Sequence, residues 1–126
     1  MARGTREISR LIKAMGGNEM SAFGLCHLGD YEATLFSKFS HNRRFGEMFV
    51  KGEKFDKLAE GVSTTKALIK LSEMYNVEMP IVYAVNQVIN YNKDVKETIS
   101  ALFLREVKDE FWYLYTYTWH LFRKSV

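Results

Sequence analysis

The sequence is poor in residues that interrupt helices and in residues that form covalent cross-links. It has one proline, Pro80, and eight glycines in 126 residues, a composition that favours helices over sheets. The single cysteine, Cys26, excludes a disulfide within the chain and is typical of a reducing compartment, so we expect a cytoplasmic location. Because Cys26 lies in an apolar run, we expect it to be a buried small hydrophobe rather than a reactive thiol.

Patterns typical of several other functions are also missing. No apolar run approaches the ~20 residues of a membrane span, and the N-terminus lacks the apolar centre of a signal peptide. The net charge of +3 is mild, so we expect neither nucleic acid nor a membrane as partner. His27 and His120 have no partners at metal-ligand spacing, so no metal site is predicted. No G-x-G-x-x-G follows a strand-like run, which excludes the usual dinucleotide-binding fold.

The residues that are present predict a compact all-α domain of about six to eight helices around an apolar centre. Hydrophobic residues make up 47% of the chain and recur with helical spacing. The expected helices cover residues 5–15, 21–28, 30–36, 41–50, 62–75 and 80–91, and a last one begins after residue 94. Ser40 and Asp94 are expected N-caps, and Ile99, Leu102 and Phe103 are expected in the core.

Residues 24–46, GLCHLGDYEATLFSKFSHNRRFG, gather polar groups that suit a small polyol carrying an anionic group. Asp30 is a lone carboxylate after an apolar segment, and Thr34 shares its helical face. Ser40-His41-Asn42-Arg43-Arg44 follows, and the start of a helix there adds backbone N–H groups that attract anions. Simpler roles stay open, because Asp30 and Ser40 could be plain N-caps and the Thr34 hydroxyl could bond back to its own helix.

Four segments in order, GLCHLGD, SHNRRFG, AEGVSTTKAL and NVEMPIVYAV, resemble the C-terminal helical substrate domain of NAD(P)-dependent glycerol-3-phosphate dehydrogenases. The resemblance runs from about residue 4 to residue 108. It implies a domain at residues 1–108 that is similar to the C-terminal domain of 6-phosphogluconate dehydrogenase, with residues 109–126 as a tail outside the pattern. It also implies hydride transfer that interconverts sn-glycerol 3-phosphate and dihydroxyacetone phosphate with NAD or NADP, in glycerophospholipid synthesis.

The resemblance also implies roles for particular residues. The implied substrate-binding residues are Asp30 and Thr34 at the glycerol end, and Ser40, His41, Asn42 and Arg44 at the phosphate. The implied cofactor contacts are His41, Leu58 and Glu60, although Glu60 could equally be a solvated carboxylate. The family's catalytic lysine and dinucleotide-binding domain precede the matching region. We therefore expect this chain to be inactive alone and to need that domain as its partner; self-association into a homo-oligomer stays open.

The sequence departs from the family pattern in three places. His41 stands where the family has arginine, the link at residues 53–59 is shorter, and the aromatic run FWYLYTYTWHLF falls in the tail. The tail could be an element that patches the core, sequence from outside the family, or a surface that a partner covers. These departures support a rival hypothesis: a catalytically inactive helical fragment, or an oligomerisation or interaction module.

Replacing His41 by arginine should strengthen binding of glycerol 3-phosphate, because a guanidinium grips phosphate through two hydrogen bonds and an imidazole cannot. Binding by the native chain should be weak and should improve in mildly acidic solution, where more of the imidazole is charged. NMR titrations of both chains in mildly acidic and mildly basic buffer measure this difference. Equal affinities of the native chain in the two buffers, or no gain with His41→Arg, would contradict the assignment.

Overall fold

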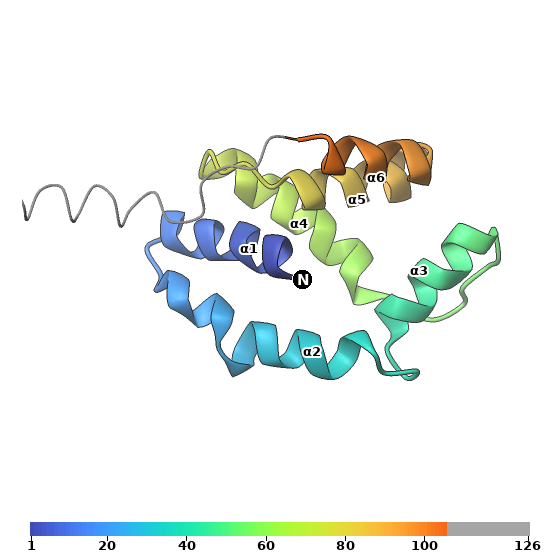
Figure 1. Ribbon diagram of the computed structural model, residues 1–126, viewed down its shortest axis with the longest axis horizontal. Helices are drawn as coiled ribbons and strands as arrows, with labels where there is room; N and C mark the ends of the chain where they lie inside the picture. Colours follow the sequence, from blue (N-terminus) through green and yellow to red (C-terminus); the bar gives the residue numbers. More distant parts are fainter. Residues whose placement is uncertain (106–126) are drawn as a thin grey trace, which may run out of the picture.

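The computed structural model describes residues 1–105, and all regular elements in that range are helical (Figure 1). The helices are α1 (Ala2–Ala14), the 3-10 helix η1 (Glu19–Phe23), the π-helical turn η2 (Leu25–Gly29), α2 (Asp30–Leu35), α3 (His41–Lys51), α4 (Glu60–Met74), α5 (Pro80–Tyr91) and α6 (Val95–Phe103). The predicted all-α class is therefore confirmed. The tail expected at residues 109–126 lies outside the described residues.

The predicted helix starts rest on local hydrogen bonds that the structure confirms. The Ser40 hydroxyl accepts from the backbone N–H of Arg43 at 3.4 Å, and the Asp94 carboxylate accepts from that of Glu97 at 2.8 Å. Pro80 occupies the first turn of α5, where its missing N–H costs nothing. Gly52 ends α3 at a φ of 72°, the left-handed conformation that glycine adopts without steric cost.

The single helix predicted for residues 21–28 is wrong, because the segment forms two short turns of different pitch. Asn18 begins η1, and its side chain accepts from the backbone N–H of Met20 at 3.0 Å. Gly24 then takes an extended conformation, with φ −89° and ψ −172°, and interrupts the helical hydrogen bonds. The π-helical η2 follows and leads directly into α2. Predicted ends elsewhere differ less: α4, for example, begins at Glu60 rather than at residue 62.

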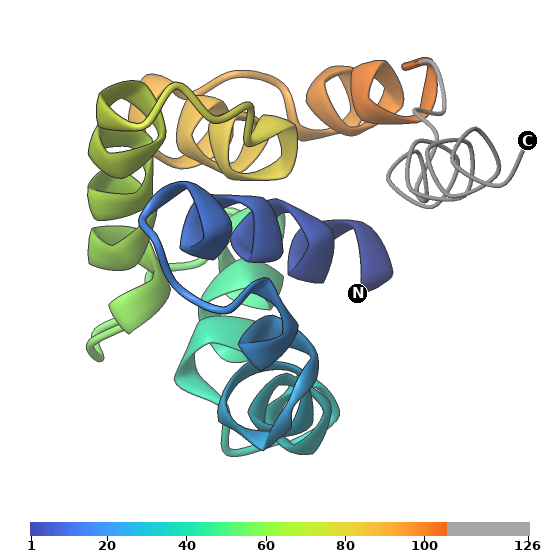
Figure 2. The same ribbon diagram turned by 90° about the vertical axis from the view of Figure 1, so that its left-hand side faces the viewer.

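Helices α4, α5 and α6 pack as consecutive neighbours, and α1 lies against both η1 and α5 (Figure 1, Figure 2). Helix α3 packs on α4. None of the helices in residues 1–105 is both long enough and apolar enough to cross a membrane.

Less apolar surface is buried than the sequence predicts. The buried hydrophobic residues of the described range are Leu11, Ala22, Ala59 and Met79. Ile99 is 46% exposed and Phe103 78%, so their expected place in a core is wrong. The apolar sides of α5 and α6 border an open cavity instead of a filled centre, which leaves Ile99 partly uncovered. Cys26, expected to be buried, is exposed, because η2 turns it outward, with its Sγ 3.2 Å from the carbonyl oxygen of Ser21.

Glu7 forms the hydrogen bonds that join the most distant parts of the described chain. Its carboxylate accepts from the backbone N–H of Ile81 at 2.8 and 3.1 Å and from that of Val82 at 3.4 Å. These are N–H groups of the first turn of α5, which have no partner inside their own helix. Arg10 adds a bond from its guanidinium to the carbonyl oxygen of Glu78 at 2.9 Å. Helix α1 thereby fixes the position of α5.

Burial raises the pKa of Glu7, although the hydrogen bonds from Ile81 and Val82 and the charges of Arg10 and Arg105 act in the opposite direction. The side chain is 4% exposed, so its carboxylate has lost most of its hydration. Folded Glu7 therefore keeps its proton to a higher pH than it does in the unfolded chain, where the pKa has its ordinary value of 4.5.

The free energy of unfolding should decline as pH rises from about 4.5 through the raised pKa of Glu7, because the folded state binds more protons than the unfolded state in that window. Glu7→Gln keeps an oxygen that can accept from Ile81 but cannot titrate, so it should remove that part of the decline. Guanidinium unfolding at a series of pH values measures the effect. Glu73→Gln, at an exposed position of α4, is the matched control and should keep the wild-type profile. The same decline in Glu7→Gln would show that other groups cause it.

Candidate functional site

Two hydrogen bonds join the first turn of α3 to the first turn of α4 and to the residues just before it. The side-chain oxygen of Asn42 accepts from the backbone N–H of Gly61 at 2.9 Å. The Nδ1 atom of His41 lies 3.2 Å from the carbonyl oxygen of Leu58. Helix N-termini carry partial positive charge, so two of them in one place make a stronger anion site than either alone. The structure thus brings together four predicted site positions: His41, Asn42, Leu58 and Glu60.

The short link between α3 and α4 is held against α3 by aromatic rings. The ring of Phe55 meets those of His41 and Phe45 edge to face, with centroid separations of 6.1 and 6.0 Å. Phe45 in turn lies 5.8 Å from Phe49 on the same helix. These contacts fix the path of the link and so the position of Leu58 just before α4. Leu58 itself is 73% exposed.

Gly61 and Phe55 belong to this arrangement, but our sequence analysis did not identify them. A Cβ atom at position 61 would lie 3.1 Å from the side-chain oxygen of Asn42, so glycine permits the close approach of the two helix starts. The available signals were a glycine directly after a helix-starting carboxylate and one aromatic residue within a charged link. Neither feature of the sequence indicates which distant residue Gly61 or Phe55 contacts.

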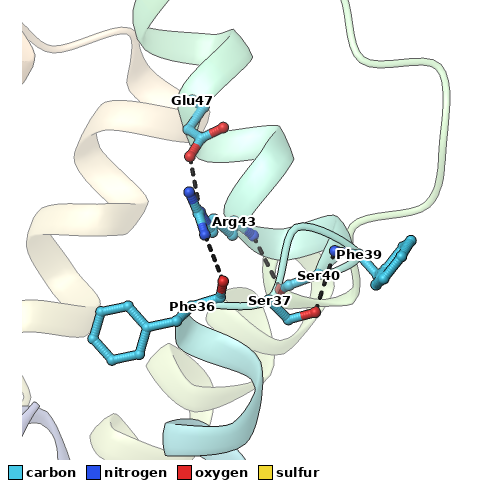
Figure 3. A network of polar contacts seen from close by, with 6 residues as sticks. All are labelled: Phe36, Ser37, Phe39, Ser40, Arg43 and Glu47. Carbon is cyan, nitrogen blue, oxygen red and sulfur yellow. Dashed lines mark hydrogen bonds and ion pairs between the residues drawn. The ribbon is translucent and has the colours of Figure 1, made fainter.

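Arg43 holds the end of α2 against the start of α3 (Figure 3). Its Nε atom pairs with the Glu47 carboxylate at 2.8 Å, and its Nη1 atom donates to the carbonyl oxygen of Phe36 at 2.9 Å. The adjoining turn is closed by the Ser37 hydroxyl, which accepts from the backbone N–H of Phe39 at 3.2 Å. The Arg43 guanidinium therefore stabilises the junction between α2 and α3. Arg44, which is exposed, is the second arginine of the cluster.

Asp30 and Thr34 lie on α2 and are separate from the pair of helix starts. Asp30 is the exposed first residue of α2 and makes no capping hydrogen bond there. The Thr34 hydroxyl donates to the carbonyl oxygen of Asp30 at 2.9 Å, so the simpler role left open for Thr34 is the one observed. Within residues 1–105, no hydrogen bond or ion pair joins either side chain to α3 or α4.

Within the described residues, the fold is an all-helical domain whose most distinctive polar feature is this convergence of two helix starts. Residues 1–100 match the family model described as NAD-dependent glycerol-3-phosphate dehydrogenase C-terminus. The chain therefore belongs to this family, as its sequence motifs predicted.

Individual relatives agree with this assignment. The chain is 42% identical over 115 residues to glycerol-3-phosphate dehydrogenase [NAD(P)+] 2 of Lactobacillus delbrueckii subsp. bulgaricus, covering 86% of this chain and 34% of the relative. It is 40% identical over 120 residues to glycerol-3-phosphate dehydrogenase [NAD(P)+] of Chlorobium phaeobacteroides, covering 90% and 36%. The Enterococcus faecalis protein of that name is 40% identical over 117 residues, covering 87% and 34%. The chain thus spans about a third of the length of these relatives.

The described residues do not by themselves fit a nicotinamide dinucleotide. A dinucleotide fold places the pyrophosphate at a turn between a strand and a helix, and residues 1–105 contain helices without strands. His41, Leu58 and Glu60 could touch such a cofactor only at its edge.

Replacing Asn42 by alanine should lower the free energy of unfolding by about 1 kcal/mol, because the backbone N–H of Gly61 loses its hydrogen-bond acceptor. Denaturant unfolding of both chains measures the difference. Arg44→Ala is the control on the same helix, since the side chain is exposed, and it should change stability by less than about 0.5 kcal/mol. Equal effects of the two substitutions would mean that the bond to Gly61 contributes nothing to stability.

Proposed function

We propose that this chain provides the substrate-binding helical domain of a cytoplasmic glycerol-3-phosphate dehydrogenase [NAD(P)+]. The full enzyme would interconvert sn-glycerol 3-phosphate and dihydroxyacetone phosphate for glycerophospholipid synthesis. The observation that carries this proposal is the family match over residues 1–100, together with the joined starts of α3 and α4 that such a phosphate would occupy. We take residues 1–108 as the domain.

The phosphate would be bound by groups at the start of α3. Asn42 uses its oxygen for Gly61, so its NH₂ group is the part that can donate to a phosphate oxygen. Ser40 accepts from Arg43 and keeps its own O–H as a donor. Arg44 supplies positive charge one turn away from His41.

His41 makes this phosphate site weaker than one with arginine at the same position. Its Nδ1 faces a carbonyl oxygen, which requires a proton on Nδ1. In the neutral imidazole, Nε2 then carries a lone pair and would repel a phosphate oxygen. Nε2 therefore offers no N–H to the phosphate, so the geometry supports weaker binding than arginine would give at this position.

The remaining predicted residues would act around this phosphate. Asp30 and Thr34 would accept hydrogen bonds from the hydroxyls of the glycerol end, and the exposed carboxylate of Asp30 is the stronger acceptor. Leu58 and Glu60, both exposed beside His41, would touch NAD or NADP held by the dinucleotide-binding domain of the full enzyme. That domain would also supply the catalytic lysine, so the isolated chain should show no turnover.

Asn42→Asp should reduce affinity for glycerol 3-phosphate at least about tenfold without unfolding the chain. The aspartate keeps an oxygen for the Gly61 N–H but adds negative charge beside the phosphate. Asn18→Asp is the matched control, because Asn18 also accepts from a backbone N–H and lies at the start of η1. NMR chemical-shift titrations with glycerol 3-phosphate, glycerol and inorganic phosphate give the affinities.

Saturable shifts at Asp30, Thr34 and residues 40–44 and 60–61, lost in Asn42→Asp and kept in Asn18→Asp, are the expected result. Equal affinity for inorganic phosphate and glycerol 3-phosphate would remove the assigned roles of Asp30 and Thr34. No shifts at millimolar ligand would overturn the proposal and favour a catalytically inactive helical fragment.

A further inference from the structure

A cavity of about 400 Å³ lies between α3 on one side and α5 and α6 on the other, and it is open to solvent. We call it the apolar groove, because carbon atoms form almost all of its lining. Its walls include Phe45 and Phe49 of α3, Val62 of α4, Val88 of α5, and Ile99 and Leu102 of α6. No charged side chain is among the residues that line it.

The residues of the apolar groove are more exposed than a folded chain normally leaves them. Val50 is 67% exposed, Val85 39% and Ile99 46%. They lie on three helices that face one space, so they form a continuous apolar surface rather than scattered exposed residues. Contiguous concave surfaces of this kind usually have an occupant.

One segment of the same chain has the composition that this occupant needs. Residues 111–122, FWYLYTYTWHLF, lie outside the described residues and contain no aspartate, glutamate, lysine or arginine. Both tryptophans of the chain, Trp112 and Trp119, are in this segment. Placing a charge in an uncharged apolar groove would be costly, whereas aromatic side chains gain from leaving water.

The position of the segment in the chain makes the apolar groove accessible to it. Leu102 lines the groove, and the described chain ends three residues later at Arg105. Residues 106–110 connect Arg105 to the segment and can span up to about 20 Å when extended. Helix α6, which borders the groove along its length, has nine residues and is therefore about 13 Å long. The tether is thus long enough for the segment to return along α6.

We propose that aromatic side chains of residues 111–122 occupy the apolar groove of their own chain. A short tether gives the segment an effective concentration near the groove in the millimolar range, which favours it over the same segment of a second copy. Asn42 and Gly61 of the proposed phosphate site also line the groove, but the apolar packing proposed here does not require that the chain bind glycerol 3-phosphate.

Tryptophan fluorescence of the full chain tests the proposal, because Trp112 and Trp119 report on this segment and on nothing else. The emission should lie well to the blue of that of the chain unfolded in guanidinium, should resist iodide quenching, and should not change on dilution. Ile99→Asp places a charge in the groove wall and should shift the emission towards that of the unfolded chain. Met74→Asp is the matched control: Met74 is 75% exposed on α4 outside the groove, so the emission should stay unchanged.

Circular dichroism of both variants shows whether the helices persist, and Val88→Asp repeats the test from α5 if Ile99→Asp fails to fold. Emission like that of the unfolded chain in the native protein would overturn the proposal. Blue emission that is lost on dilution would also overturn it, in favour of a second copy as the occupant. Blue emission that persists in folded Ile99→Asp and Val88→Asp would place the segment elsewhere.

Discussion

The hydrogen bonds between Glu7 and the first turn of α5 hold the two halves of the described chain together. The N-terminal half runs from α1 to α2, and the C-terminal half comprises α4, α5 and α6. Few other contacts cross between the two halves. Helix α1 touches α5 near these hydrogen bonds, and α3, which connects the halves, touches α4. The carboxylate satisfies N–H groups that α5 cannot satisfy itself, and Met79 is fully buried just before that helix begins. Retaining a buried carboxylate is costly, and the same loss of hydration raises its pKa.

The site depends on the same kind of interaction at a second place. Asn42 satisfies an N–H group of the first turn of α4, as Glu7 does for α5. In both cases a side chain from one helix completes the exposed start of another, so the contact is polar and directional rather than a broad apolar interface. This explains how the chain keeps a defined arrangement around the α3 and α4 starts although few of its apolar residues are buried.

What the sequence could predict follows from the distance over which each interaction acts. The Ser40 and Asp94 caps involve a residue and its third neighbour, so the pattern of residues suffices to find them. The bonds from Gly61 to Asn42 and from Ile81 to Glu7 connect positions 19 and 74 residues apart, and no local pattern encodes them. The predictions of which residues are buried failed for a related reason. Cys26 and Ile99 lie in apolar runs, but whether a neighbour covers them depends on how the helices are placed.

The close approach of Gly61 to Asn42 makes the two positions interdependent in evolution. Any side chain at position 61 would press on the amide that bridges the helices, and any residue at 42 without an oxygen of the right length would leave the glycine N–H unpaired. Two independent changes would each carry a penalty, while a joint change could restore the fit. Homologues of this chain should therefore show correlated substitutions at these positions, separated by 19 residues in sequence but adjacent in space.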